Sequence, residues 1–150
     1  MLESIISDAS TIIALEKIDS LPLLCQIYSE VIIPEAVSNE IGNLSLKCFS
    51  IRKVESTFIK LLIENLNLGK GEAEVIALAH LTGLKALIDD LKARKIAENM
   101  GLNISGTIGV LLKAEKLGLI ESALTKVKDL KDKGFFIPTD LIEDLAKLKK

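Results

Sequence analysis

The chain has 150 residues, of which 49% are hydrophobic and 27% are charged. This length is enough for a sizeable core, and we expect one domain spanning residues 1–150. Mean hydropathy is +0.38, yet no apolar stretch approaches the roughly 20 residues that cross a bilayer. No basic segment followed by an apolar run and a small-residue cleavage site opens the chain. We therefore expect a cytoplasmic protein with no membrane partner.

The formal net charge of −2 argues against a nucleic-acid binder that relies on overall positive charge. Local basic surface is still available. Lys92, Arg94 and Lys95 form one basic cluster, directly after two aspartates. Such runs are usually solvated helix faces, and we prefer that interpretation for a second cluster near the C-terminus. The second cluster consists of Lys126, Lys128, Lys131 and Lys133.

Cysteine and histidine are scarce in this chain. Cys25 and Cys48 lie far apart, and the only histidine is His80. Neither cysteine has a second cysteine or a histidine at metal-ligand spacing. We therefore expect two reduced thiols in the core, rather than a zinc site or a disulfide. Any catalytic chemistry would have to come from carboxylates.

The first half of the chain predicts short strands that alternate with helices. Residues 4–7 are apolar and β-branched, which predicts a strand that stops at Asp8. A helix is expected over 11–17, with Ser10 as its N-cap. The other elements expected in this half are a helix over 20–28, a strand over 31–33, a helix opened by Pro34 and a helix over 53–64.

The second half continues the alternation. Gly69-Lys70-Gly71 interrupts the chain before an alanine-rich helix over 72–81, and a strand over 85–88 ends in Asp89 and Asp90. The further elements expected are a helix over 91–100 closed by Gly101, a strand at 103–104, helices over 107–117 and 121–133, and a helix from Pro138 to the C-terminus. This alternation predicts an α/β fold with a small, mostly parallel central sheet and helices on both faces.

Several acidic residues fall where a parallel sheet can bring them together. Such sheets bind ligands at the carboxyl ends of their strands. Asp8 ends the first predicted strand and the pair Asp89 and Asp90 ends a later one, so they meet if these strands are neighbours. Glu72 and Glu40 lie in line with apolar residues of their helices. Buried carboxylates without partners are costly, and one shared divalent cation would satisfy several of them.

Each of these acids also has a purely structural interpretation. Asp8 and Asp90 can cap the helices that follow them, Glu72 can complement a helix dipole, and Glu40 can lie at the surface. Glu74 lies two positions from Glu72, about 200° around a helix, so the two cannot point to one site. Periodicity does not choose between these two glutamates. The first-turn position favours Glu72.

Five segments, in this order, resemble a PIN domain, specifically the compact branch found among prokaryotic toxin-like nucleases. The most distinctive segment is GEAEVIALA over 71–79, which in that branch supplies the third acid. The other four segments are IISDAST over 5–11, VIIPEAV over 31–37 followed by Glu40, LIDD over 87–90 with Ala93 and Arg94, and GTIGVLL over 106–112. The resemblance covers most of the chain and is weakest over 43–66.

The resemblance implies a metal-dependent endoribonuclease that hydrolyses RNA phosphodiester bonds. Its implied ligands for Mg²⁺ or Mn²⁺ are Asp8, Glu40, Glu72 and the aspartate pair, in which either Asp89 or Asp90 could be the ligand. Candidate RNA contacts are Ser10, Lys92, Arg94 and Thr107. The resemblance also implies the toxin of a toxin–antitoxin pair, a homodimer and an antitoxin protein as partner.

Two other functional classes are alternatives to this one. A non-catalytic RNA- or protein-binding module on the same fold is the main alternative, because basic residues are few and the net charge is negative. A nucleotide-binding α/β domain is disfavoured, because the chain has neither the glycine-rich P-loop pattern nor a GxGxxG turn.

Overall fold

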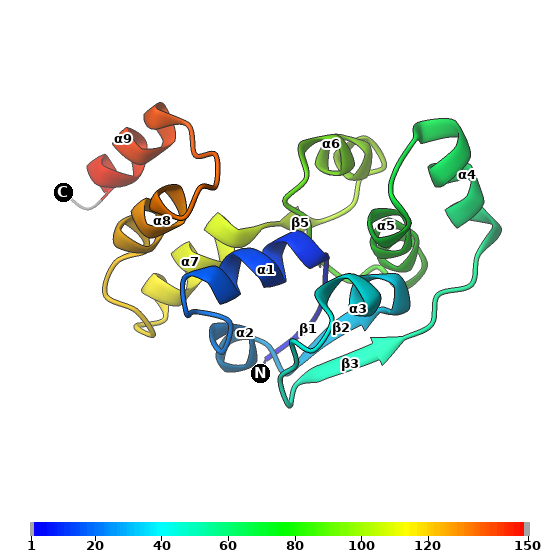
Figure 1. Ribbon diagram of the computed structural model, residues 1–150, viewed down its shortest axis with the longest axis horizontal. Coiled ribbons are helices and arrows are strands. Elements are labelled where there is room, and N and C mark those ends of the chain that lie inside the picture. The colour runs from blue at the N-terminus through cyan, green and yellow to red at the C-terminus, as the bar shows by residue number, and fades with distance from the viewer. Residues whose placement is uncertain (1, 149–150) are drawn as a thin grey trace.

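The computed structural model describes residues 2–148, which form a five-stranded parallel sheet flanked by helices (Figure 1). The strand order is β3-β2-β1-β4-β5. The strands are β1 (Ser4–Ser7), β2 (Glu30–Pro34), β3 (Phe49–Arg52), β4 (Ala86–Leu87) and β5 (Ile104–Ser105). The helices are α1 (Ala9–Lys17), α2 (Leu23–Ile27), α3 (Glu35–Ile41), α4 (Thr57–Leu66), α5 (Lys70–Thr82), α6 (Leu91–Asn99), α7 (Thr107–Lys116), α8 (Ala123–Asp132) and α9 (Thr139–Leu148). The predicted α/β architecture is confirmed.

The central strands β1 and β2 carry the most deeply buried side chains of the sheet. Ile5 and Ile6 of β1 pair with Val31 and Ile32 of β2. All four are at most 1% exposed. Parallel strands covered on both faces appear in a sequence as continuous apolar runs, which is why these two strands were predictable from the sequence.

The order of the strands reverses at β1, which lies between β2 and β4. The chain runs outward from β1 to β2 and β3, and then returns to the other side for β4 and β5. Because parallel crossovers are right-handed, the helices of the two halves cover opposite faces. Helix α5 packs against β1, β2 and β4, and α7 packs against α1, α2 and β5. The carboxyl ends of β1 and β4 therefore meet where the connections diverge, a common place for a ligand.

The helix predicted over 53–64 begins later than expected, and the strand before it was not predicted. Ser56 caps α4, its Oγ accepting a hydrogen bond from the Phe58 N–H at 3.1 Å. Strand β3 is at the edge of the sheet, and Ile33 and Pro34 of β2 pair with its Ile51 and Arg52. All four residues of β3 are half-buried or exposed. Since β3 has no clear apolar alternation, pairing with β2 rather than local pattern defines it.

Other helix ends also differ from the prediction. Asp8, not Ser10, is the N-cap of α1, and α2 is confined to Leu23–Ile27. Pro34 precedes the first residue of α3 instead of occupying it. The elements predicted after Gly71 are present, with described ends shifted by at most two residues. The predicted extension of the last helix to residue 150 lies outside the described residues.

Helices α8 and α9 extend away from the sheet at one side of the molecule (Figure 1). Helix α8 packs on α7, and α9 packs on α8. Val127 and Leu130 of α8 and Leu145 of α9 are buried. Residues 133–138 connect the two helices. No helix within residues 2–148 combines the length and the apolar character needed to cross a bilayer.

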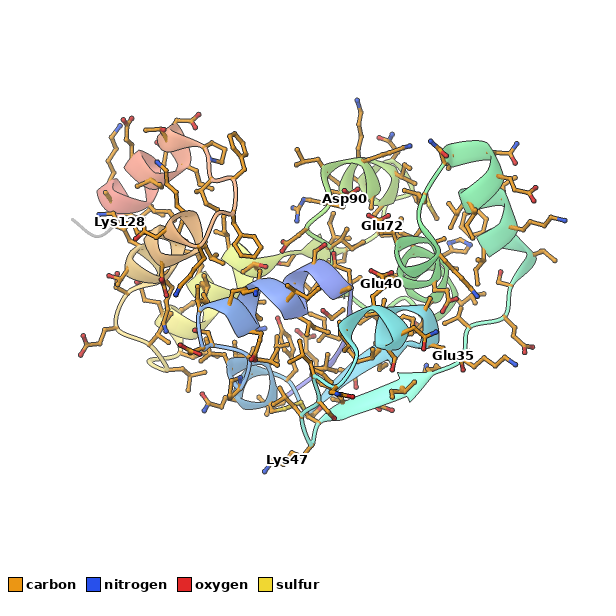
Figure 2. The ribbon with its side chains drawn as sticks, in the orientation of Figure 1. Glu35, Glu40, Lys47, Glu72, Asp90 and Lys128 are labelled. Atoms are coloured by element: carbon orange, nitrogen blue, oxygen red, sulfur yellow. A yellow bond between two sulfur atoms is a disulfide. The ribbon has the colours of Figure 1, made fainter. Side chains whose placement is uncertain are left out.

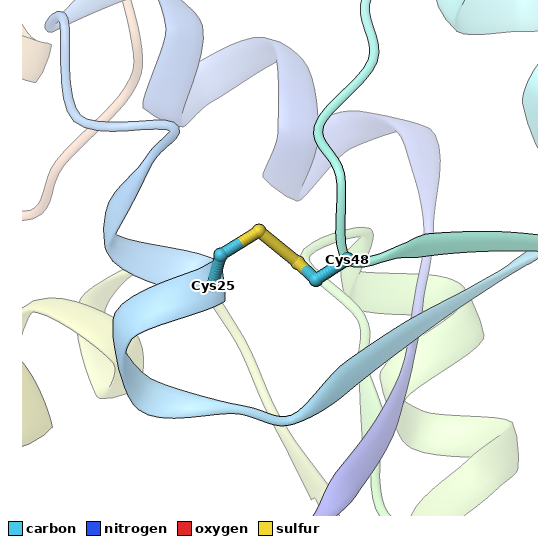
Figure 3. Close-up of a disulfide and its surroundings, with 2 residues drawn as sticks. All are labelled: Cys25 and Cys48. Carbon is cyan, nitrogen blue, oxygen red and sulfur yellow. A yellow bond between two sulfur atoms is a disulfide. The ribbon is translucent and has the colours of Figure 1, made fainter.

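Cys25 and Cys48 form a disulfide (Figure 3), so the prediction of two reduced thiols is wrong. Helix α2 leads into β2, and Cys48 directly precedes β3. The Val31 N–H donates to the Cys48 carbonyl at 2.9 Å, which holds the start of β3 beside β2. The two cysteine Cα atoms are 5.7 Å apart, within the range that a disulfide spans. The sequence did not reveal this proximity because it depends on the unpredicted strand.

Candidate active site

Asp8 and Asp89, which we call the inner pair, meet where β1 and β4 end. Asp8 is 3% exposed. Its Oδ1 accepts a hydrogen bond from the Thr11 N–H and its Oδ2 from the Asp89 N–H, both at 2.8 Å. The pKa of Asp8 is raised to about 6: burial raises it most and the charge of Asp89 adds to the rise, against the lowering effect of the two N–H donors. Asp8 therefore caps α1 and also joins two strand ends.

Asp89 is fixed to the start of α7. Its Oδ1 accepts the Thr107 N–H at 2.8 Å, and its Oδ2 accepts the Thr107 hydroxyl. This close approach needs a glycine, because a Cβ on Gly106 would collide with Asp89 Oδ1 and lie 3.0 Å from Arg94 Nη1. Arg94 Nη1 donates to the Ile88 carbonyl at 2.8 Å. The guanidinium is thus held at the same end of the sheet as the inner pair.

Glu40, Glu72 and Asp90, which we call the outer group, come together from α3, α5 and the start of α6 (Figure 2). Asp90 caps α6, and Glu72 Oε1 accepts the Gly69 N–H at 3.1 Å. Burial raises the pKa of Glu72, and the charges of Asp90 and Glu40 raise it further. Glu40 reaches α5 so closely that a Cβ on Gly71 would collide with its Oε1. The outer group is therefore a set of mutually repelling carboxylates.

Glu72 and Glu74 have different roles on α5. Glu74 is 4% exposed, and its Oε1 accepts the Ala36 N–H at 3.0 Å in the first turn of α3. Pro34 offers no side-chain cap to that helix. Glu74 thus satisfies a helix N-terminus that lacks its own cap. The structural role of Glu74 was not apparent from the sequence, because its partner lies 38 residues away.

The five carboxylates of the inner pair and the outer group have no ion-pair partner within residues 2–148, where the two ion pairs are Lys53–Glu55 and Lys113–Glu3. Thr11 Oγ1, beside Asp8, is buried without a hydrogen-bond partner. Carboxylate and hydroxyl oxygens are the ligands that hard divalent cations prefer, so the donor chemistry fits Mg²⁺ or Mn²⁺.

The same carboxylates do not form a finished metal cage. Within residues 2–148, no three His, Cys, Asp or Glu side chains are close enough to hold a metal ion as they stand. Like charges repel, and a divalent cation would offset that repulsion. Binding a divalent cation would therefore require the outer group and the inner pair to draw together.

Two of the four predicted RNA contacts, Arg94 and Thr107, lie at this end of the sheet beside Asp89. Ser10 is exposed in the first turn of α1. Lys92 Nζ donates to a backbone carbonyl in the connection between α4 and α5 at 3.2 Å. Arg94 and Thr107 thus form hydrogen bonds within the site, whereas the Lys92 ammonium forms its hydrogen bond outside the site.

A cavity of about 750 Å³ opens beside Asp89 and Asp90, and sequence reasoning missed most of its wall. It lies between α6, β5 and the start of α7 on one side and the connection from α8 to α9 on the other. Leu91 and Phe136, which are 80% and 87% exposed, both line it. The adjacent phenylalanines after Gly134 were the available indication, in a chain with four phenylalanines in all.

A family model described as a PIN domain matches residues 4–150. The match begins with the first residue of β1 and includes every acid of the inner pair and the outer group. No curated protein matches the chain. The match agrees with the resemblance found in the sequence, at the level of the family.

Proposed function

The chain belongs to the PIN domain family, and from this premise we propose that it is a divalent-metal-dependent endoribonuclease that hydrolyses RNA phosphodiester bonds. PIN domains are generally nucleases that use a divalent metal. The observation that carries the proposal is the convergence of acids from separate segments. The Asp89 N–H donates a hydrogen bond to Asp8, which joins the ends of β4 and β1. The charges of Asp90 and Glu40 contribute to the raised pKa of Glu72.

The proposed ligands of Mg²⁺ or Mn²⁺ are Asp8, Glu40 and Glu72 together with the aspartate pair. Both aspartates stay candidates, because Asp89 is tied to Asp8 whereas Asp90 faces Glu72. A bound divalent cation lowers the pKa of its water and offsets charge on the scissile phosphate. The chain supplies orientation: backbone N–H groups fix both oxygens of Asp8, and α7 fixes Asp89.

Histidine does not contribute a general base at this site. His80 lies near the opposite end of α5 from Glu72, about 12 Å along the helix axis. Its ring packs against Phe58, with ring centroids 5.5 Å apart. Carboxylates and the cation they bind would therefore have to supply the proton transfers.

Asp8→Asn tests the proposal directly. We expect metal-dependent cleavage to fall about 1,000-fold or more, because the variant loses a charge at the centre of the site. Cleavage would be followed on a labelled single-stranded RNA with Mg²⁺ or Mn²⁺. The new amide leaves one of the two N–H donors without an acceptor, which costs about 1–3 kcal/mol, and loss of the buried charge offsets part of that cost. Circular dichroism would confirm that the variant is folded at the assay temperature.

Asp19→Asn is the matched control for this variant. Asp19 is exposed just after α1, and its φ of 52° is a conformation that asparagine tolerates. The control should cleave like the wild type. Equal cleavage by the wild type and by Asp8→Asn, with contaminating ribonuclease excluded, would defeat the proposal.

A non-catalytic RNA- or protein-binding module is the second candidate. The observation in its favour is that no three acids within residues 2–148 form a ready ligand set. Calorimetric titration with Mn²⁺, in the presence and absence of RNA, separates the two candidates. Heat of metal binding that disappears in Asp8→Asn supports the nuclease, and no metal binding even with RNA present supports the module.

The narrower expectations from the resemblance stay predictions. They are a toxin role, an antitoxin partner, a homodimer and a cytoplasmic location. Sedimentation would measure the oligomeric state. The Cys25–Cys48 disulfide bears on the location, because disulfides persist in oxidising compartments and in the cytosol of hyperthermophiles.

A further inference from the structure

The cavity beside Asp89 and Asp90 has one apolar side and one polar side. Its apolar wall includes Ile104, Phe135 and Ile137, and its polar end consists of the two aspartates with Arg94 and Thr107. In Figure 1 the connection between α8 and α9 faces the end of the sheet where β5 and α6 lie. A volume of about 750 Å³ falls within the roughly 300–1,000 Å³ typical of small-ligand sites.

The apolar wall is not a closed core. Among the large apolar side chains of residues 2–148, Phe136 and Leu91 are the two most exposed, at 87% and 80%. Phe135 and Ile137, on either side of Phe136, pack against the core instead. Apolar side chains left in water and gathered at one cavity indicate a binding surface.

The charges around the cavity suit a phosphate-bearing ligand. Arg94 lines the cavity and is held by the Ile88 carbonyl. The exposed Lys131 and Lys133 follow the lining residue Leu130 in the chain and precede Phe135, which also lines the cavity. Figure 2 shows Lys128, from the same basic cluster, away from Glu72 and Asp90. Arg94 therefore supplies positive charge in the cavity wall itself, whereas the lysines belong to the neighbouring end of α8.

We propose that this cavity binds an unpaired nucleobase of single-stranded RNA, with the Phe136 ring stacked on the base and the adjoining phosphate at the acids. The inference rests on the proposed function, since it places the substrate of that site. Aromatic rings bind bases of any sequence through their faces, and a base inside a duplex cannot offer its face. An apolar protein segment without a basic side chain would instead leave Asp89 and Asp90 buried without a partner, which is costly.

The test is the affinity of a labelled six-nucleotide single-stranded RNA, measured by fluorescence anisotropy with Ca²⁺ in place of Mg²⁺ or Mn²⁺, so that a cation offsets the acids, and under conditions in which a gel shows the RNA intact. Phe136→Ala should weaken binding by about 5-fold to 150-fold, the usual effect of removing a stacked aromatic residue. Phe136→Leu keeps apolar volume without a ring, and its RNA affinity should lie between those of the wild type and Phe136→Ala. The matched control is Ile51→Ala on β3, at the opposite edge of the sheet; Ile51 is 64% exposed, and affinity should be unchanged.

A 2-aminopurine base in the same RNA provides a direct measure of stacking. Its fluorescence should be quenched by the wild type and not by Phe136→Ala. In cleavage assays, Phe136→Ala should raise KM with little change in kcat, as expected for a residue that binds substrate and transition state alike.

Two results would overturn this inference and leave the proposed nuclease standing. One is unchanged RNA affinity and quenching in Phe136→Ala, with cleavage still lost in Asp8→Asn. The other is a change from dimer to monomer in Phe136→Ala at unchanged RNA affinity, which would assign the cavity to a second copy of the chain. If instead the wild type binds no RNA and Asp8→Asn changes nothing, the proposed function itself fails.

Discussion

The two ends of the parallel sheet are built in opposite ways. The amino end holds the Cys25–Cys48 disulfide and the Lys113–Glu3 ion pair, with the Lys113 ammonium 5.0 Å from the centre of the Tyr28 ring. The carboxyl end gathers five carboxylates that have no ion-pair partner within residues 2–148. One end thus contributes cross-links and attraction, and the other holds like charges together. Sites prepared for chemistry commonly cost stability in this way.

The carboxyl end tolerates these charges because helix N-termini surround it. Asp8, Asp89 and Asp90 accept hydrogen bonds from N–H groups in the first turns of α1, α7 and α6. The positive ends of three helix dipoles therefore point at three of the acids. The capping role and the proposed ligand role are not alternatives here, since the same side chains that cap the helices are the ones that the strands bring together.

After the loss expected in Asp8→Asn, the largest expected effect separates Glu72 from Glu74 on one helix. Glu72→Gln should lower metal-dependent cleavage by about 100-fold or more, because it removes a proposed ligand. It should also make the metal-free protein more stable, because the charges of Asp90 and Glu40 no longer act on it. Glu74→Gln keeps an oxygen for the Ala36 N–H and should cleave like the wild type. Equal losses of cleavage in the two variants would contradict the assignment of Glu74 to structure.

A smaller effect is expected at the amino end. The disulfide closes a loop with a sequence separation of 23, and replacing Cys25 and Cys48 with alanine should cost about 3 kcal/mol of unfolding free energy. Denaturant titration would measure it. Cleavage below the melting temperature should be unaffected, because the disulfide lies at the other end of the sheet. A reducing agent should lower the Tm of the wild type and leave the Tm of the variant unchanged. A wild-type Tm that stays the same with and without the reducing agent would show that the thiols are not bonded.

The smallest predicted effect is a pH dependence of the metal-free protein. Asp8 has a pKa of about 6 in the folded chain and 3.8 as its ordinary value, so the folded state holds this proton more tightly. Stability should therefore rise as pH falls from 7 to 5, by about 1 kcal/mol from Asp8 alone. Urea titrations in EDTA would measure it, and Asp8→Asn should flatten the dependence. Stability that falls over this range in the wild type would contradict the raised pKa.

The sequence by itself determined the central strands, helix α5 and the positions of three acids at strand ends. The buried runs of β1 and β2 were visible because both faces of those strands are covered. The alanine-rich pattern placed α5, and the α/β alternation placed Asp8 and the pair Asp89 and Asp90 at strand ends. Their convergence needed only that β1 and β4 be neighbours, and they are.

Only the tertiary structure decided the features that depend on a distant partner. Strand β3 exists through its ladder with β2, and the disulfide follows from that ladder. Glu74 differs from Glu72 because Ala36, far away in the chain, offers it an unpaired N–H. The cavity at Phe136 forms between the connection from α8 to α9 and the start of α6. A local pattern of apolar residues indicates which side of one segment is buried. The contacts above join segments that are distant in the chain, and their separation in space is set only when the chain packs.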